Sequence, residues 1–305
     1  MADVTASMVK ELRTSTGVGM MDAKKALVAN DGDMEKSVDW LRTQGLSKAE
    51  KKAGRTAAEG LVGVVTEGAA GSVVEVNSET DFVSRNEEFQ SFVREIVNVA
   101  KTVDSVEALA AADLGGKSVE DAITSKIATI GEHMSLRRMT TLKVSEGAVV
   151  GYVHSALADG LGKIGVLVAL ESSASDDALQ AIGKQIAMHI AASNPRFLGK
   201  DDVAADVLER ERAVLKEQAI ASGKPPEIAE KMVDGRIRKF YGEICLTEQM
   251  FIMDTDKTVA EAVAAAGKDA GTEIKLVAFT RVQLGEGIEK KEEDFAAEVA
   301  AVANG

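Results

Sequence analysis

Residues that usually carry out catalysis are scarce in this chain. The three histidines, His133, His154 and His189, are scattered, and Cys245 is the single cysteine. No CxxC or HExxH spacing occurs, so the sequence predicts no metal site. A G-x-S-x-G nucleophile elbow is also absent, and 49 carboxylates make chance pairs certain. The sequence therefore predicts no catalytic residues and favours a binding or regulatory protein over an enzyme.

Two glycine-rich stretches match phosphate-binding motifs in part. Residues 160–165, GLGKIG, match G-x-G-x-x-G, a pattern that binds a pyrophosphate only where it follows a strand and begins a helix. Here the apolar run Val166–Leu170 follows directly, which predicts a strand and makes the glycines a hairpin loop. The run Gly115–Ser118 has Ala111 where a phosphate loop needs its first glycine. Neither motif predicts a bound cofactor.

Two other stretches are candidates for binding a partner. Residues 78–86, SETDFVSRN, place Phe82 among short polar side chains in a chain with only 8 phenylalanines. Composition favours burial of Phe82 beneath its own hairpin, and the functional alternative exposes it as a wedge beside Asp81. Met20 and Met21 begin a predicted helix at positions about 100° apart, so both cannot be fully buried in a small bundle. They are either one buried and one partly exposed residue or an adaptable contact patch.

Length and charge narrow the class of protein further. A chain of 305 residues is long enough for two or three domains, and its 45% of apolar residues can form their cores. The net charge of −13 disfavours broad nucleic-acid binding. A charged N-terminus, one cysteine and no apolar run near the ~20 residues that span a bilayer predict a cytoplasmic protein without membrane contact.

The elements that must position these residues begin with a small helical domain. Residues 1–46 predict three short helices, with Gly45 at the end of the third. Their predicted inner faces carry Val9, Leu12, Ala23, Ala26, Leu27, Val38 and Leu41. The polar and basic residues 47–57 are interpreted as a linker.

A pattern of strand, turn, strand and helix then occurs twice, at an offset of about 90 residues. The predicted strands lie at 61–65, 72–76, 149–154 and 165–170, and the two helices have apolar faces at 89–97 and 179–190. We interpret residues 58–145 and 146–200 as two related α/β subdomains with antiparallel sheets, derived from an internal duplication. A chance match remains the alternative, because a hairpin followed by a helix is common.

The remaining residues predict a helical hairpin and a return to the core. Residues 201–240 form two helical patterns on either side of Ser222–Pro226, which predicts an antiparallel, coiled-coil hairpin that protrudes from the core. Residues 241–284 return to the second subdomain and include a strand at 273–284. Residues 285–305 predict a C-terminal module, with a helix that docks through Phe295, Val299 and Val302. The predicted fold class is α+β.

Several long stretches of the sequence match one protein family in the same order. They are TASMVKELRTSTGVGMMDAKKAL (5–27), EVNSETDFV (75–83), MHIAASNPRF (188–197), SGKPPEIAEKMVDGRIRKF (222–240) and GEGIEKKEEDFAAEVA (285–300). Together they extend over essentially the whole chain. The sequence therefore resembles the bacterial elongation factor Ts family, the nucleotide-exchange factors of elongation factor Tu.

The resemblance implies a fold and a function. The fold has a ubiquitin-associated-like N-terminal domain, a core of two subdomains, a protruding helical hairpin and a C-terminal module. The implied function is in translation: the protein binds GDP-bound and nucleotide-free elongation factor Tu, disturbs its magnesium site and promotes GDP release so that GTP can bind. A 1:1 and a 2:2 complex are both open. The family implies no cofactor, no covalent chemistry and no direct contact with nucleic acid.

The resemblance also implies which residues contact the GTPase. The family loop that disturbs the magnesium site corresponds to Thr80, Asp81, Phe82 and Val83. The N-terminal contact with the GTPase corresponds to Arg13, Met20 and Met21. In the second subdomain, His154 matches an interface histidine that helps to displace the phosphate side of the nucleotide pocket. A stand-alone adaptor, which binds a partner without changing nucleotide turnover, is the alternative function, and an enzyme is disfavoured.

Overall fold

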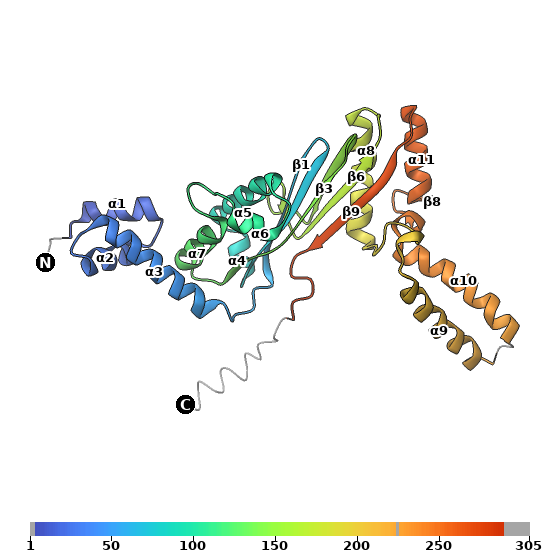
Figure 1. Ribbon diagram of the computed structural model, residues 1–305, viewed down its shortest axis with the longest axis horizontal. Coiled ribbons are helices and arrows are strands. Elements are labelled where there is room, and N and C mark those ends of the chain that lie inside the picture. The colour runs from blue at the N-terminus through green and yellow to red at the C-terminus, as the bar shows by residue number, and fades with distance from the viewer. Residues whose placement is uncertain (1–3, 224–225, 290–305) are drawn as a thin grey trace. The chain divides into compact units, whose positions relative to one another are not determined.

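The computed structural model describes residues 4–223 and 226–289 and has an α+β fold (Figure 1). These residues contain eleven α-helices and three small sheets, in agreement with the predicted class. The chain divides into two compact units. The first unit contains residues up to 62, then 74–139 and the residues from 283, and the second contains 63–73 and 140–282.

Three helices begin the first unit: α1 (Ala6–Thr16), α2 (Met20–Ala29) and α3 (Met34–Lys52). Thr5 caps α1 by accepting a hydrogen bond from the Met8 amide at 3.3 Å, and Asp33 caps α3 in the same way. The helices enclose a small apolar core of Val9, Leu12, Ala23, Ala26 and Leu27, against which Trp40 and Leu41 pack.

Two sequence predictions for α3 are wrong. The helix does not end at Gly45 but continues to Lys52, and Gly45 is buried where an added Cβ would lie 3.4 Å from the Cβ of Ala128. A glycine inside a helix allows such a close approach. Val38 is 41% exposed rather than buried. Its neighbour Ser37 is buried instead, with its hydroxyl donating to two backbone carbonyls.

A four-stranded sheet follows, in the order β3-β2-β1-β5. Its strands are β1 (Glu59–Glu67), β2 (Ala70–Ser78), β3 (Met134–Lys143) and β5 (Leu161–Gly162). The helices between β2 and β3 are α4 (Asp81–Ser84), α5 (Glu87–Val99), α6 (Val106–Ala111) and α7 (Val119–Ile130). The predicted apolar face of α5 is confirmed, since all five of its residues are buried: Phe89, Phe92, Val93, Ile96 and Val97.

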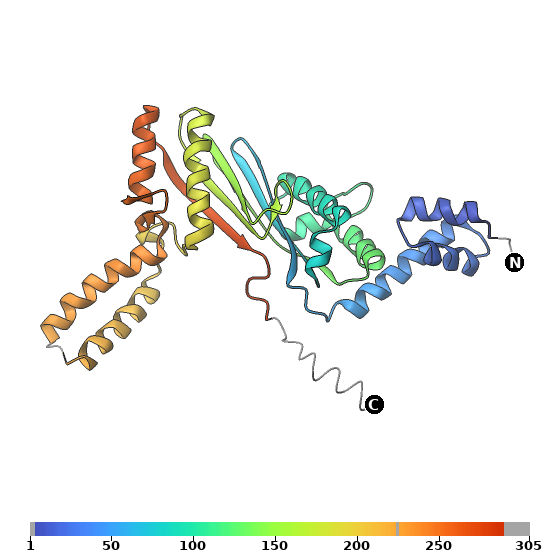
Figure 2. The ribbon, with the colours of Figure 1, turned by 180° about the vertical axis from the view of Figure 1, so that it is seen from behind.

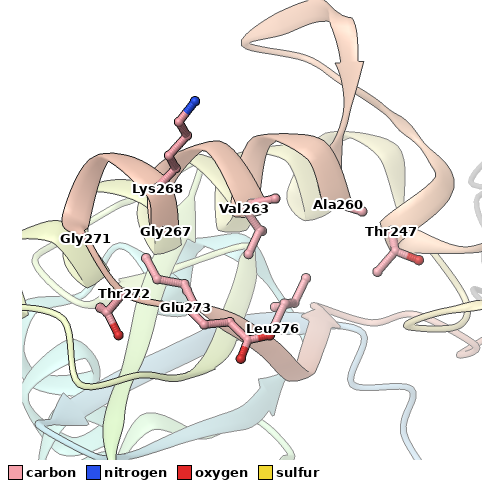
Figure 3. A pocket seen from close by; sticks show the side chains of 11 residues that line it. Thr247, Ala260, Val263, Gly267, Lys268, Gly271, Thr272, Glu273 and Leu276 are labelled. Carbon is pink, nitrogen blue, oxygen red and sulfur yellow. The ribbon is translucent and has the colours of Figure 1, made fainter.

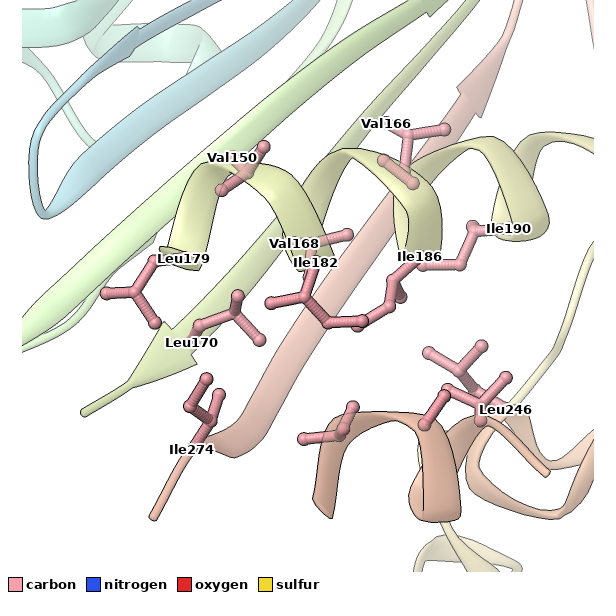
Figure 4. Packing of buried hydrophobic residues seen from close by; sticks show 14 of the residues in the cluster. Val150, Val166, Val168, Leu170, Leu179, Ile182, Ile186, Ile190, Leu246 and Ile274 are labelled. Carbon is pink, nitrogen blue, oxygen red and sulfur yellow. The ribbon is translucent and has the colours of Figure 1, made fainter. Parts of the chain in front are cut away.

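The second unit contains a three-stranded sheet in the order β4-β6-β9, from strands β4 (Gly147–His154), β6 (Ile164–Glu171) and β9 (Lys275–Gln283). Helix α8 (Asp176–Ser193) packs on β4 and β6, as Figure 4 shows. Gly183 permits this packing, because a Cβ there would lie 2.5 Å from a methyl group of Val150. The glycine-rich residues 160–165 lead into β6 rather than into a helix, as predicted, and they begin in the connection between the antiparallel strands β4 and β6. Within that connection Leu161 and Gly162 form the short strand β5, which was not predicted.

Helices α9 (Ala205–Ala221) and α10 (Pro226–Ile244) lie side by side in both views (Figures 1 and 2). They share a narrow apolar seam of Leu208, Leu215, Val233, Ile237 and Tyr241, as expected of a helical hairpin. The sequence did not predict the short strands β7 (Met250–Phe251) and β8 (Asp254–Thr258) or the helix α11 (Val259–Ala270). The predicted C-terminal helix at 290–305 lies outside the described residues.

Membrane insertion through a helix finds no support in the described part of the chain. Within residues 4–223 and 226–289, no helix combines the length and the apolar character that a bilayer crossing requires.

Candidate functional site

The turn after β2 presents Phe82 to solvent. Phe82 is the second residue of the four-residue helix α4, and it is 79% exposed. Burial beneath its own hairpin, which composition favoured, is therefore wrong. Among the large apolar side chains that the structure describes as exposed, Phe82 has the greatest exposed fraction. A bare aromatic ring of this kind is characteristic of a contact surface rather than of a core.

The residues that follow Phe82 anchor the turn to the sheet. Val83 and Ser84 are buried, and the Ser84 hydroxyl donates to the Gly60 carbonyl of β1 at 2.8 Å. The side-chain amide of Gln90 in turn donates to the Ser84 carbonyl at 3.0 Å. The C-terminal end of α4 is thus fixed by buried hydrogen bonds while Phe82 stays outside.

A second helix begins almost at once and limits α4 to a single turn. Asn86 accepts hydrogen bonds from the amides of Glu88 and Phe89 at 2.8 and 3.2 Å and so caps α5. On the exposed side, the carboxylate of Asp81 pairs with Arg85 one turn later at 3.0 Å. This pair is open to water, so it adds little to stability and leaves the acid available to a partner.

Glu132 holds the N-terminal end of the turn. It accepts hydrogen bonds from both the backbone amide and the hydroxyl of Thr80, at 3.0 and 2.7 Å. Sequence reasoning missed Glu132, because it lies 52 positions away among many other acids and no local pattern connects it to the turn. The turn is therefore a rigid platform, held at both ends, with one aromatic ring projecting from it.

Met20 and Met21 form a second exposed apolar feature. They are 61% and 65% exposed, so neither is buried. Helix α2 directs its other face inward through Ala23, Ala26 and Leu27. Arg13 lies exposed in the last turn of α1, the helix that packs against α2.

His154 lies at the exposed end of β4, in the second unit. Its Nδ1 atom is 3.2 Å from the hydroxyl of Tyr152, and the two rings lie 6.2 Å apart between centroids. Residues two apart on a strand project from the same face, so this contact lies on one face of β4.

Two features of the described residues bear on catalysis, namely the placement of metal-ligating side chains and a hollow along α11. In that part of the chain, no three or more His, Cys, Asp or Glu side chains lie close enough together to hold a metal ion. The hollow along α11 has a volume of about 550 Å³ and is lined mainly by small and aliphatic residues (Figure 3). Its ionisable side chains are Lys268 and Glu273, which point in different directions (Figure 3). A nucleophile paired with a base is not found in this lining.

Comparison with known proteins gives a consistent result. The family model described as Elongation factor TS matches residues 79–286, which include the turn that carries Phe82. Elongation factor Ts of Sphingopyxis alaskensis is 61% identical over 306 residues, with 99% of each chain covered. Elongation factor Ts of Allorhizobium ampelinum is 58% identical over 309 residues, with 100% of each chain covered. Because one family accounts for most of the chain by its model and for nearly all of it by its relatives, this chain belongs to the Elongation factor Ts family.

Proposed function

We propose that this protein is a guanine-nucleotide exchange factor that binds elongation factor Tu, disturbs its magnesium site and promotes the release of GDP. The observation that carries the proposal is the 79% exposure of Phe82 on a turn that is held at both ends. A rigid exposed ring can enter a partner without a large loss of conformational entropy on binding. Membership of the Elongation factor Ts family supports the same function.

The mechanism acts at a distance from the nucleotide. Phe82 inserts beside a helix of the GTPase and shifts it, while Asp81 and Thr80 contact the rim of the insertion site. Val83 is buried and keeps the turn in place. Because magnesium clamps the phosphates and the switch loops together, a small displacement of the supporting helix loosens the clamp. Nucleotide and exchange factor then weaken each other's binding reciprocally, so that GDP leaves and GTP can enter.

Other residues supply binding energy. Met20, Met21 and Arg13 on the N-terminal helices form an adaptable contact with the GTPase, since methionine side chains fit irregular surfaces. His154 contacts the phosphate side of the nucleotide pocket. In this proposal the N-terminal helices are a ubiquitin-associated-like domain, and the two strand–helix patterns are related subdomains. The partner is bound both with GDP and without nucleotide.

The test is the release of labelled GDP from elongation factor Tu. The wild-type protein is expected to accelerate release, and Phe82→Ala is expected to reduce the acceleration at least about tenfold with an unchanged melting temperature, as for an anchor residue at the centre of an interface. Met253→Ala, which also truncates an exposed apolar side chain, is the matched control and should behave as wild type. Binding without acceleration by the wild type would support a stand-alone adaptor instead. Unfolding of Phe82→Ala would show that the ring is structural.

A further inference from the structure

Two carboxylates, on two different segments of the first unit, form hydrogen bonds at the start of the turn that carries Phe82. Glu132, in the loop between α7 and β3, directs one oxygen to the Thr80 amide at 3.0 Å and the other to the Thr80 hydroxyl at 2.7 Å. Glu79 reaches in the opposite direction and accepts a hydrogen bond from the His133 amide. The adjacent residues Glu79 and Thr80 are therefore hydrogen-bonded to the adjacent residues His133 and Glu132. We call Glu79, Thr80, Glu132 and His133 the acidic clasp.

The acidic clasp is supported from a third segment. Arg55, in the connection after α3, pairs with the second oxygen of Glu79 at 3.2 Å. Lys52, at the end of α3, donates to the carbonyl of Gly131, the residue before Glu132. Arg55 thus attracts one of the two acids directly, and Lys52 fixes the backbone next to the other. The acidic clasp therefore has two basic side chains close to its two carboxylates.

The acidic clasp changes what Thr80 does for α4. A threonine at the N-cap position usually turns its hydroxyl toward the first helical amides. Thr80 is the N-cap residue of α4, but its hydroxyl accepts no capping hydrogen bond and instead donates to Glu132. A hydrogen bond to a carboxylate is stronger than one to a neutral acceptor. In place of a local capping bond, the Thr80 hydroxyl makes a bond to Glu132, which is distant in sequence, and this bond orients the turn.

We propose that Glu132 is a positioning residue for nucleotide exchange, which fixes the direction of Phe82 by holding Thr80. This inference rests on the proposed exchange function. Helix α4 is a single turn, so its own hydrogen bonds cannot define its direction. The buried bond between Ser84 and Gly60 fixes one end, and the acidic clasp fixes the other. Loss of the clasp leaves the turn hinged at Ser84, with Phe82 distributed over several directions.

The first measurement is hydrogen exchange at the amides of residues 80–85 in the free protein. Glu132→Ala is expected to leave the competent orientation populated only about one tenth of the time, so almost all protection there should be lost. Glu132→Gln keeps the size of the side chain, but its NH₂ group cannot accept a hydrogen bond, so a smaller loss is expected. Glu88→Gln is the matched control, because Glu88 is another paired acid of the same unit, bound to Lys126. It should leave protection at residues 80–85 unchanged.

The second measurement is GDP release from elongation factor Tu at increasing concentrations of exchange factor. For Glu132→Ala, the half-saturating concentration should rise about tenfold while the rate at saturation changes less than about twofold. The reason is that ordering of the turn becomes a cost of binding, whereas the bound state keeps the same contacts. In the Thr80→Val background, Glu132→Ala should have a smaller effect than in the wild type, because Thr80→Val already removes the hydroxyl bond to Glu132 and keeps only the amide bond.

The outcomes separate this inference from the proposed function. If the wild-type protein does not accelerate GDP release, the exchange function is wrong, and hydrogen exchange still decides whether Glu132 orders the turn. Unchanged protection at residues 80–85 in Glu132→Ala would overturn the acidic clasp. Lower protection with an unchanged half-saturating concentration would overturn its role in exchange. If Glu132→Ala melts early, Glu132→Gln at an unchanged melting temperature decides by the same criteria.

Discussion

Gly60 lies beneath the turn that carries Phe82 and has a backbone φ of +123°. Its carbonyl accepts the hydrogen bond from Ser84. A Cβ at this position would lie 2.2 Å from the carbonyl oxygen of Val76 on the neighbouring strand. Only glycine adopts this conformation without strain and leaves room for the partner strand. The identity of one residue in β1 therefore fixes the anchor of a turn that is distant in sequence.

Gly60→Ala is expected to lower the free energy of unfolding by about 1–3 kcal/mol through backbone strain alone, with the contact to Val76 adding to the loss. Gly54→Ala is the control, because Gly54 has open space around its Cα and no positive φ. That substitution should change the free energy of unfolding by less than about 0.5 kcal/mol. Chemical denaturation measures both. Equal stability of the two variants would show that the backbone at Gly60 relaxes freely.

Helix α8 contributes many of the buried side chains in the core of the second unit. Its residues Ile182, Ile186 and Ile190 recur at four-residue spacing and contact the strands through Val168 and Leu170 (Figure 4). The same spacing made the helix predictable from the sequence. What the spacing did not reveal is the close fit of α8 to β4 at Gly183, which depends on two residues far apart in the chain, Gly183 and Val150.

Ile186→Ala is expected to destabilise the protein by about 2–5 kcal/mol, because Ile186 is fully buried and the substitution leaves a cavity. Lys184→Ala, on the exposed side of the same helix, should stay within about 0.5 kcal/mol of the wild type. Thermal and chemical unfolding compare the two. A small loss for Ile186→Ala would mean that the surrounding side chains collapse into the space.

The two units contain different buried ionisable groups. In the first, burial favours a raised pKa for Glu75, but hydrogen bonds from Gly285, Asn77, Arg138 and Arg137 outweigh it and hold the pKa below the usual 4.5. In the second, burial lowers the pKa of His189 below 6.5 against the opposing hydrogen bond with Gln249. The Nδ1 atom of His189 accepts the Ile252 amide, so Nε2 carries the proton toward Gln249.

These shifts predict two windows of acid destabilisation. Because the unfolded chain binds a proton more readily than native His189, stability is complete above pH 6.5 and falls as the pH drops below that value. His133, whose pKa burial also lowers, contributes in the same window. Native Glu75 has a pKa below 4.5, so below about pH 4.5 the unfolded chain binds a proton more readily than the native protein does. The stabilisation from Glu75 is therefore present above pH 4.5 and is lost at lower pH.

Calorimetry between about pH 8 and pH 3 measures the unfolding free energy of the whole protein and so tests both windows. His189→Gln should show a smaller fall in the unfolding free energy between about pH 7 and 5.5 than the wild type. The same variant should retain the loss below pH 4.5. An identical pH slope in the variant and the wild type would contradict the assignment to His189. The Glu75→Gln variant serves as the complementary control, because it should keep the upper window and show a smaller loss in the lower one. Asp33, Asp254 and Glu261, whose pKa values hydrogen bonds also lower, continue to contribute there.

The sequence by itself determined the fold class, the helices with regular apolar spacing, the strand–turn–strand–helix patterns and the family. These features are local, because apolar residues on the buried face recur every three or four positions in a helix and every two positions in a strand. Helix α11 and the short strands β7 and β8 were missed. The end of α3 was misplaced because glycine usually ends a helix, and only contact with α7 shows why Gly45 continues it.

Only the tertiary structure decided that Phe82 is exposed and what holds it there. Composition favoured a buried ring, because aromatic side chains are buried on average and composition does not say where a particular residue lies in the fold. The direction of the ring depends on Glu132 and Gly60, which lie far after it and well before it in the chain. Such pairs meet only after the sheet and α7 have packed, so no local pattern encodes them. The candidate site residues were named from the sequence, whereas the exposure of Phe82 and the contacts that hold its turn arose from folding.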